Sequence, residues 1–300
     1  MMPTIHVPVM PDEVMEWLDP QPGQIMVDGT LGGGGHTRLL AAAVADEGRV
    51  VAVDRDPAPV ARAETTLKGL PILLAQSTYA DIPEILEESG IEGVDGVLLD
   101  LGLSSDQLED RERGFSFHSD GPLDLRFDPE SGKSAAQLLQ RITPESLADI
   151  IYQYGEERFS RRIARAICDR QRQKPVTTAA DLAEIVSRCI PARVRHQQQI
   201  HPATRTFQAL RIAVNEELKQ LEIALKRLPD CLNPGGKLVI ISFHSLEDRM
   251  VKNAFRDDDR LEVLTRKPVL ATEAEVDRNP RARSAKLRVA RRVALTGEGG

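Results

Sequence analysis

The chain contains no apolar run long enough to cross a bilayer. Its opening residues, Met-Met-Pro-Thr-Ile-His, lack the basic start and apolar middle of a signal peptide. It has only three cysteines, Cys168, Cys189 and Cys231, and neither these nor the six histidines show metal-ligand spacing. These absences argue against membrane, disulfide and metal-centred proteins, so we expect a cytoplasmic chain with reduced thiols, no membrane association and no metal.

What the chain does have is enough apolar material for a sizeable core. It is 300 residues long with 41% hydrophobic residues, which predicts one large domain and a smaller one. The formal net charge of −7 argues against indiscriminate coating of nucleic acid.

The most informative feature is a glycine-rich turn. Residues 25–36 run Ile-Met-Val-Asp-Gly-Thr-Leu-Gly-Gly-Gly-Gly-His, an apolar run typical of a buried strand followed by four consecutive glycines and a helix-prone stretch. Without Cβ atoms the main-chain amides can approach a ligand closely, and a helix start favours negative charge. The pattern predicts a nucleoside-binding loop that would accept a carboxylate or phosphate.

The spacing of the glycines narrows the choice of ligand. A dinucleotide fingerprint from Gly32 would need a tiny residue where Thr37 stands, and a P-loop would need a lysine that does not follow these glycines. S-adenosylmethionine remains, since its carboxylate could take the loop amides. A nicotinamide oxidoreductase is kept as the rival interpretation, weakened by the glycine register.

Residues at the ends of later strand-like runs extend this site. Asp54 ends the run 49–54, twenty residues after Gly34, the spacing at which a carboxylate accepts from ribose hydroxyls; its alternative is a helix cap. Asp100 could accept from the ligand or a reacting amine, or cap a turn. Tyr79 could stack on adenine or lie in the core.

Strand-like and helix-like runs alternate through the first hundred residues, which predicts a doubly wound parallel sheet with ligands at the carboxyl ends of its strands. From 134 to 200 only helical patterns occur, and strand-like runs resume at 236–243, 261–265 and 285–289. We therefore expect a discontinuous sheet domain, residues 1–133 and 201–300, interrupted by a helical insertion, residues 134–200. The Gly-, Ser-, Asp- and Arg-rich segment 100–126 between them is expected to be an ordered, functional loop.

Two basic stretches stand out in an acidic protein. The first, residues 158–174, places its cations opposite an apolar helical face, and the second, residues 278–292, contains no acid. A solvated charged face explains either alone, but two together favour contact with a polyanion.

Long stretches of the chain resemble the S-adenosylmethionine-dependent small-subunit (16S) ribosomal RNA methyltransferase H family, RsmH, also called MraW. The stretches that carry the resemblance run from the first ten residues to the last fifteen: His6–Met10, Asp28–His36, Asp54–Pro57, Asp100–Ser105 with Gln107 and Leu108, Arg113–Phe117, Tyr154–Glu157, His201–Ile212 with Val214–Glu216, Ser242–Arg249 and Asn279–Arg288.

The resemblance implies a Rossmann-like methyltransferase sheet, mostly parallel with one antiparallel strand near the C-terminus, and an inserted helical domain that recognises RNA. It implies methyl transfer from S-adenosylmethionine to the exocyclic amine (N4) of a cytidine in the decoding region of 16S ribosomal RNA, within the assembling or assembled 30S subunit. Whether the chain is a monomer or a homodimer is left open. Another nucleic acid, a small molecule, or a non-catalytic RNA-binding assembly role are the alternatives.

The resemblance also implies site residues. The cofactor contacts carried over are Gly34, Gly35, His36, Asp54, Tyr79, Asp100 and Gln107. Tyr79 departs from the phenylalanine more common in the family, and Asp124-Leu-Arg-Phe-Asp128 has Leu and Phe where methionines are common; both changes keep the chemistry. The residues expected to face RNA are Arg158, Arg161, Arg162, Arg165 and Arg205, with Gln208 as the alternative to Arg205.

Methylation of a cytosine amine must overcome a weak nucleophile, because its lone pair is delocalised into the ring. The chain lacks the Asn/Asp-Pro-Pro-aromatic motif of many amino methyltransferases and has Asp100-Leu-Gly-Leu instead. We expect catalysis to rest on in-line placement and water exclusion, with Asp100 accepting the amine's hydrogens. His244 is a second catalytic candidate, as a base or a backbone contact, and Ser245 with Asp248 is expected to cap the following helix.

Overall fold

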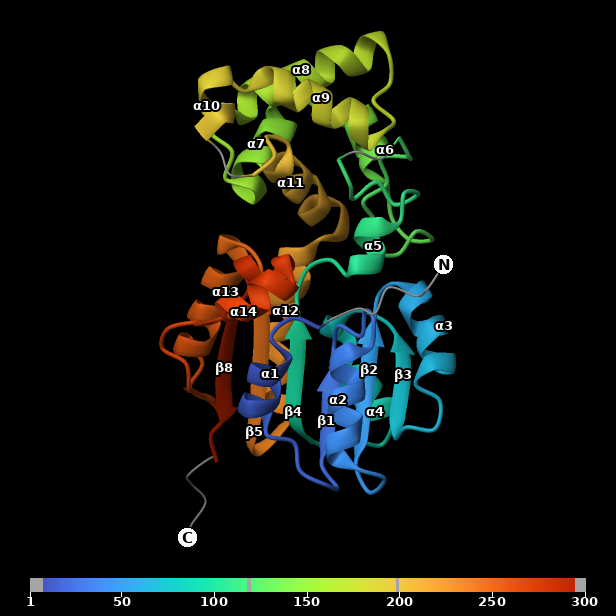
Figure 1. The fold of residues 1–300 in the computed structure, drawn as a ribbon, viewed down its shortest axis with the longest axis vertical. Helices are drawn as coiled ribbons and strands as arrows, with labels where there is room; N and C mark the ends of the chain where they lie inside the picture. Colours follow the sequence, from blue (N-terminus) through green and yellow to red (C-terminus); the bar gives the residue numbers. More distant parts are fainter. Residues whose placement is uncertain (1–7, 118–119, 198–199, 295–300) are drawn as a thin grey trace. The chain divides into compact units, whose positions relative to one another are not determined.

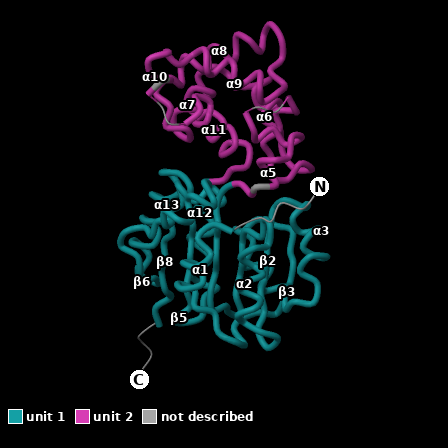
Figure 2. Tube along the Cα trace, viewed as in Figure 1, with its two compact units in different colours: residues 1–102, 218–300 teal, residues 103–217 magenta. Residues whose placement is uncertain are grey.

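The computed structural model describes residues 8–117, 120–197 and 200–294, so the first two residues of the His6–Met10 stretch lie outside it. The chain divides into two compact units, shown in Figure 2. We call residues 1–102 with 218–300 the sheet unit and residues 103–217 the helical unit. The helical unit interrupts the other unit, as expected, but it begins earlier and ends later than the predicted range 134–200.

The sheet unit is built on one eight-stranded sheet (Figure 1). Strands β1 to β5 pair in parallel, whereas β8 is antiparallel to β5, β6 and β7. This arrangement confirms the predicted mixed sheet with one reversed strand near the C-terminus. In spatial order the strands are β3 (Ile72–Gln76), β2 (Arg49–Asp54), β1 (Ile25–Asp28), β4 (Val94–Asp100), β5 (Leu232–Ser242), β8 (Lys286–Arg292) and β6 (Leu261–Val263), with β7 (Val269–Leu270) also on β8.

Helices cover both faces of this sheet, which is why its central strands are apolar throughout. On one face Ile82, Leu225 and Phe255 pack against strand residues such as Val97, and on the other Leu40 packs in a second buried cluster. The strands β1, β2 and β4 therefore lie between two apolar layers, as expected for doubly wound parallel strands. The helices are α1 (Pro11–Leu18), α2 (Gly35–Val44), α3 (Pro57–Thr66), α4 (Ile82–Glu88), α12 (Glu217–Cys231), α13 (Ser245–Asp257) and α14 (Glu273–Arg278), with 3₁₀ turns η1 (Tyr79–Asp81) and η2 (Pro280–Ser284).

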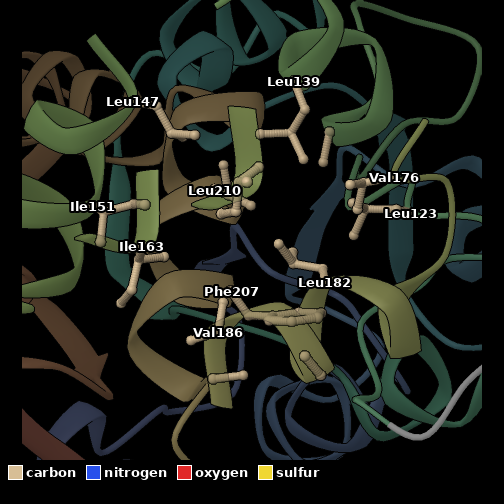
Figure 3. Packing of buried hydrophobic residues seen from close by; sticks show 14 of the residues in the cluster. Leu123, Leu139, Leu147, Ile151, Ile163, Val176, Leu182, Val186, Phe207 and Leu210 are labelled. Carbon is tan, nitrogen blue, oxygen red and sulfur yellow. The ribbon is translucent and has the colours of Figure 1, made fainter. Parts of the chain in front are cut away.

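The helical unit has a core of its own. Leu147, Ile151, Ile163, Leu182 and Leu210 meet in its centre (Figure 3). No helix in the described ranges combines the length and apolarity needed to span a membrane. The helices are α5 (Ser105–Glu109), α6 (Ala135–Arg141), α7 (Pro144–Gly155), α8 (Ser160–Gln173), α9 (Ala179–Cys189), α10 (Ala192–Gln197) and α11 (Thr204–Asn215).

The segment preceding α6 is ordered and belongs to the helical unit. The side chain of Asn215 accepts the Phe127 N–H at 2.7 Å and donates to the Leu125 carbonyl at 2.7 Å. Leu123 and Leu125 are fully buried in the helical core. The described part of the segment therefore packs on the helical core, which explains why the unit starts well before residue 134; its predicted functional role stays a prediction.

Gly155 closes the contact between α7 and α11. A Cβ on Gly155 would lie 2.4 Å from the carbonyl oxygen of Arg205, so the two backbones meet where no side chain fits. We expect Gly155→Ala to lower the free energy of unfolding by about 1–3 kcal/mol, measured by chemical denaturation. Gln153→Ala, at an exposed position of the same helix, should change it by less than about 0.5 kcal/mol. Equal midpoints for the two variants would contradict this.

Candidate functional site

The glycine loop leaves the carboxyl end of β1, in the middle of the sheet. Gly32 and Gly34 have positive φ angles of 47° and 74°, and Gly34 is the N-cap of α2. Gly34 N–H donates to the Leu31 carbonyl at 2.7 Å, which closes a tight turn. A Cβ on Gly35 would lie 2.9 Å from the ring of Pro8. The loop therefore needs glycine for its conformation and for its close packing.

Asp54 ends β2, next to β1, and holds this loop directly. Its carboxylate accepts the Gly32 N–H at 2.8 Å and the Asp56 N–H at 2.9 Å. Burial raises the pKa of Asp54 to about 6 despite these hydrogen bonds. The cap of α3 is Asp56, which accepts from Ala58 N–H, so the alternative that Asp54 caps this helix is wrong.

Asp100 ends β4, on the other side of β1, and its carboxylate is buried. One carboxylate oxygen lies 3.8 Å from Nε2 of the buried His36, and the other, Oδ1, is buried without a hydrogen-bond partner among the described residues. Burial raises the pKa of Asp100 to about 7; Arg281 opposes this, and Asp28 and Glu247 add to it. A carboxyl poised near neutrality suits a group that exchanges hydrogen bonds with a charged ligand.

Tyr79 lies beside the start of the same loop. It begins the 3₁₀ turn η1, capped by Thr78, directly after β3. A Cβ built on Gly29 would lie 3.1 Å from the Cβ of Tyr79. The side chain is partly buried against the sheet core, so both of its predicted roles remain compatible with its position.

His244 has a structural task at the end of β5. It is the N-cap of α13, with its Nδ1 accepting the Glu247 N–H at 3.4 Å, while Glu247 accepts the Phe243 and His244 N–H groups. The predicted cap, Ser245 with Asp248, is therefore wrong by one residue, and Asp248 instead pairs with Arg288 at 2.7 Å. The catalytic role of His244 stays a prediction.

Most of the predicted cofactor residues are brought together by the strand order. Because β2, β1 and β4 are neighbours, their carboxyl ends place Asp54, the glycine loop and Asp100 at one edge of the sheet. Gln107 belongs to the helical unit, where it forms a capping box with Ser104 at the start of α5. Its contact with the cofactor stays a prediction.

One carboxylate of this site, Asp28, went unpredicted. Asp28, 1% exposed, accepts from the Thr37 hydroxyl at 2.6 Å and from Thr30 N–H at 3.1 Å. Burial raises its pKa above the ordinary value for an aspartate. The signal was present in the Asp-Gly-Thr start of the loop, where a buried strand ends in an acid with two hydroxyl residues nearby.

The two basic stretches differ in how their charge is used. On α8 the side chains of Arg161, Arg162 and Arg165 are exposed and have no acidic partner in the described chain. In the stretch 278–292, by contrast, most cations of β8 are paired with acids, which argues against the predicted polyanion contact there. These pairs are Lys286 and Arg288 with Asp248, Arg291 with Glu262, and Arg292 with Asp230.

Arg205 and Gln208 serve the helix contact at Gly155. Arg205 donates to the Glu156 carbonyl at 3.2 Å and Gln208 to the Tyr154 carbonyl at 2.9 Å, so both cap the end of α7. An RNA contact of Arg205 stays a prediction. Among the residues that the structure describes, no group of three or more His, Cys, Asp and Glu side chains could hold a metal ion.

The model of the MraW methylase family matches residues 3–293. The chain belongs to this family. Among its curated MraW-type relatives is a ribosomal RNA small subunit methyltransferase H of Rhodopirellula baltica, 54% identical, with 97% of this chain and 92% of the relative covered. Proteins of the same name from Synechococcus elongatus and Trichlorobacter lovleyi are 48% and 46% identical, each over 96% of this chain and 95% and 98% of their own length.

Proposed function

We propose that this chain transfers a methyl group from S-adenosylmethionine to the N4 amine of a cytidine in small-subunit (16S) ribosomal RNA. The observation that carries the proposal is the near-full-length match to proteins named ribosomal RNA small subunit methyltransferase H. The geometry at the carboxyl ends of β1, β2 and β4 supports it, because that edge joins an amide-rich loop to two carboxylates.

The residues at this edge fit the cofactor. The buried Asp100 Oδ1 has no hydrogen-bond partner among the described residues, so it can receive a hydrogen bond from a ligand. The carboxylate of S-adenosylmethionine would lie at the start of α2, held by Gly34, Gly35 and His36. Asp54 would bind its ribose, and Tyr79 would stack on its adenine. Bound there, S-adenosylmethionine supplies an electrophilic methyl group on a sulfonium.

Asp100 is the proposed acceptor for the hydrogens of the attacking amine. Its carboxylate oxygen without a partner can take such a hydrogen bond as positive charge develops on the amine. His244 is the weaker candidate, since its Nδ1 already caps α13 and its Nε2 lies 3.1 Å from Glu247. The remaining contribution is placement of the amine in line with the methyl group.

The helical unit is the proposed RNA-recognition domain. Arg158, Arg161, Arg162 and Arg165 stand before and within the first two turns of α8, whose first turn contains no acid. Cations at a helix N-terminus are unfavourable for the helix itself. Helix stability therefore does not explain these residues, whereas binding of RNA phosphates does. The target base would be splayed out of its stack so that its amine can reach the methyl group of S-adenosylmethionine.

The proposed setting is cytoplasmic, on RNA within the assembling or assembled 30S subunit. The test is mass spectrometry of ribosomal RNA nucleosides after under-methylated small subunits are incubated with the chain and labelled S-adenosylmethionine. We expect N4-methylcytidine carrying the label. Label on another nucleoside would redirect the substrate, and RNA binding without label transfer would favour a non-catalytic assembly role. A thermal shift with NADH and none with S-adenosylhomocysteine would favour an oxidoreductase.

A further inference from the structure

A chain of hydrogen bonds joins the glycine loop to the proposed catalytic carboxylate. Asp28 accepts the Thr37 hydroxyl at 2.6 Å from the first turn of α2, and its other oxygen accepts the Thr30 N–H at 3.1 Å. The Thr30 hydroxyl lies 3.4 Å from that same oxygen and accepts the backbone N–H of Asp100 at 2.7 Å. The end of β1, the start of α2 and the end of β4, which is 70 positions further along the chain, therefore meet at one buried aspartate and one hydroxyl.

The Thr30 hydroxyl takes over where the strand ladder stops. The parallel pairing of β1 with β4 ends at Asp28 opposite Leu98, and Gly29 N–H then donates to the Leu98 carbonyl at 2.9 Å. Asp100 lies two residues beyond, where β1 has already turned into the loop. A side-chain oxygen thus replaces the main-chain acceptor that the strand no longer offers.

This replacement affects the position of Asp100 more than the stability of the sheet. The other edge of β4 continues in register with β5, where Asp100 pairs with Ile241 and Leu101 N–H donates to the Ile241 carbonyl at 2.9 Å. Loss of the Thr30 hydroxyl would leave that ladder intact. It would free the Asp100 end of β4 to shift relative to the loop.

We propose that Asp28 and Thr30 are positioning residues for the methyl-donor site, which hold the Asp100 carboxylate at a set distance from the glycine loop. The proposal rests on the proposed function, because it names what orders that same site. Neither residue needs to touch the ligand. Asp54 also holds the loop, because its carboxylate accepts the Gly32 N–H. The loop is therefore held from both flanking strands. A shift at Asp28 then changes the distance between the loop and the Asp100 carboxylate and does not unfold the turn.

The test compares Thr30→Val with Thr30→Ser by calorimetry with S-adenosylhomocysteine. Thr30→Val removes the acceptor for Asp100 N–H at nearly constant volume, and we expect at least about a tenfold weaker Kd. Thr30→Ser keeps the hydroxyl and should bind within about twofold of the unchanged chain. Asp28→Asn removes the charge at the centre of the chain of hydrogen bonds and should weaken binding in the same direction.

Thr265→Val is the matched control. The Thr265 hydroxyl also accepts a strand amide, Val289 N–H at 2.8 Å, but on β8 away from the loop. We expect it to lower thermal stability as much as Thr30→Val while leaving the Kd unchanged.

Unchanged binding by Thr30→Val, or equal weakening by Thr265→Val, would overturn the proposal. If Thr30→Val does not fold, unchanged binding by Asp28→Asn overturns it instead. Failure of the unchanged chain to bind S-adenosylhomocysteine would count against the proposed function itself.

Discussion

Replacement of Arg161, Arg162 and Arg165 by glutamine is expected to weaken binding of small-subunit ribosomal RNA by about a hundredfold at low salt. These side chains are exposed on α8 without acidic partners in the described chain. Each phosphate that they neutralise releases a counterion, so the slope of log affinity against log salt should fall by about two to three. Filter binding or fluorescence anisotropy over a salt series measures both quantities.

The chain offers a control with the same change in charge. Arg188, Lys226 and Arg256 are also surface cations and lie outside α8, but each forms an ion pair on its own helix, with Glu184, Glu222 and Asp257. Their replacement by glutamine should reduce RNA affinity only slightly. If both triple variants lose affinity equally, net charge rather than the α8 surface is responsible. Unchanged affinity of the α8 variant would remove this helix from the RNA contact.

The second large effect is expected at Asp100. Asp100→Asn removes the only carboxylate at the end of β4 and should weaken S-adenosylhomocysteine binding by about tenfold or more, because the ligand's ammonium loses an anionic partner. Methylation should also slow at saturating donor if this residue accepts the amine's hydrogens. Weakened binding with a normal saturated rate would remove Asp100 from catalysis and leave it a binding residue.

The raised pKa of Asp100 gives this prediction a pH signature. With a pKa of about 7, a rise from pH 6.5 to 8 increases the ionised fraction, and so the affinity, by about fourfold. Asp100→Asn serves as the reference and should flatten this dependence of affinity on pH. In the absence of ligand, the contribution of Asp100 to folding stability changes with pH in the opposite direction. The folded chain binds more protons at this group than the unfolded chain, so its contribution to stability falls as pH rises from about 4 to 7.

The sheet and the residues at the carboxyl ends of its strands could be predicted from the sequence, because the patterns that indicate them are local. Apolar runs that end in an acid, such as 49–54, predicted both the strands and the carboxylates at their ends. The four glycines predicted the loop, because Cβ atoms there would prevent the main-chain amides from approaching a ligand closely. Helical patterns were likewise predicted from 134 to 200, where the structure has helices such as α7 and α9.

Long-range packing was not accessible in the same way. Leu123 and Leu125 show no helical or strand period, so nothing local assigns them to the helical core that buries them. The pairing of Arg288 with Asp248 joins residues 40 positions apart, so nothing local in the sequence shows that this cation of the basic stretch has an acidic partner. His244 acts as an N-cap although serine and threonine are the usual residues there.

The interrupted order of the strands has a consequence for biosynthesis. β4 is complete at Asp100, but its partner β5 begins only at Leu232, after the whole helical unit has been made. At about 5–20 residues per second the ribosome needs roughly 7–26 seconds to supply that partner. During this interval the nascent half-sheet presents an open apolar edge, the kind of surface that aggregates. The helical unit, with its own core, can meanwhile fold first. Arrival of β5 then covers the open side of β4, and the other side of β5 is covered only when β8 follows.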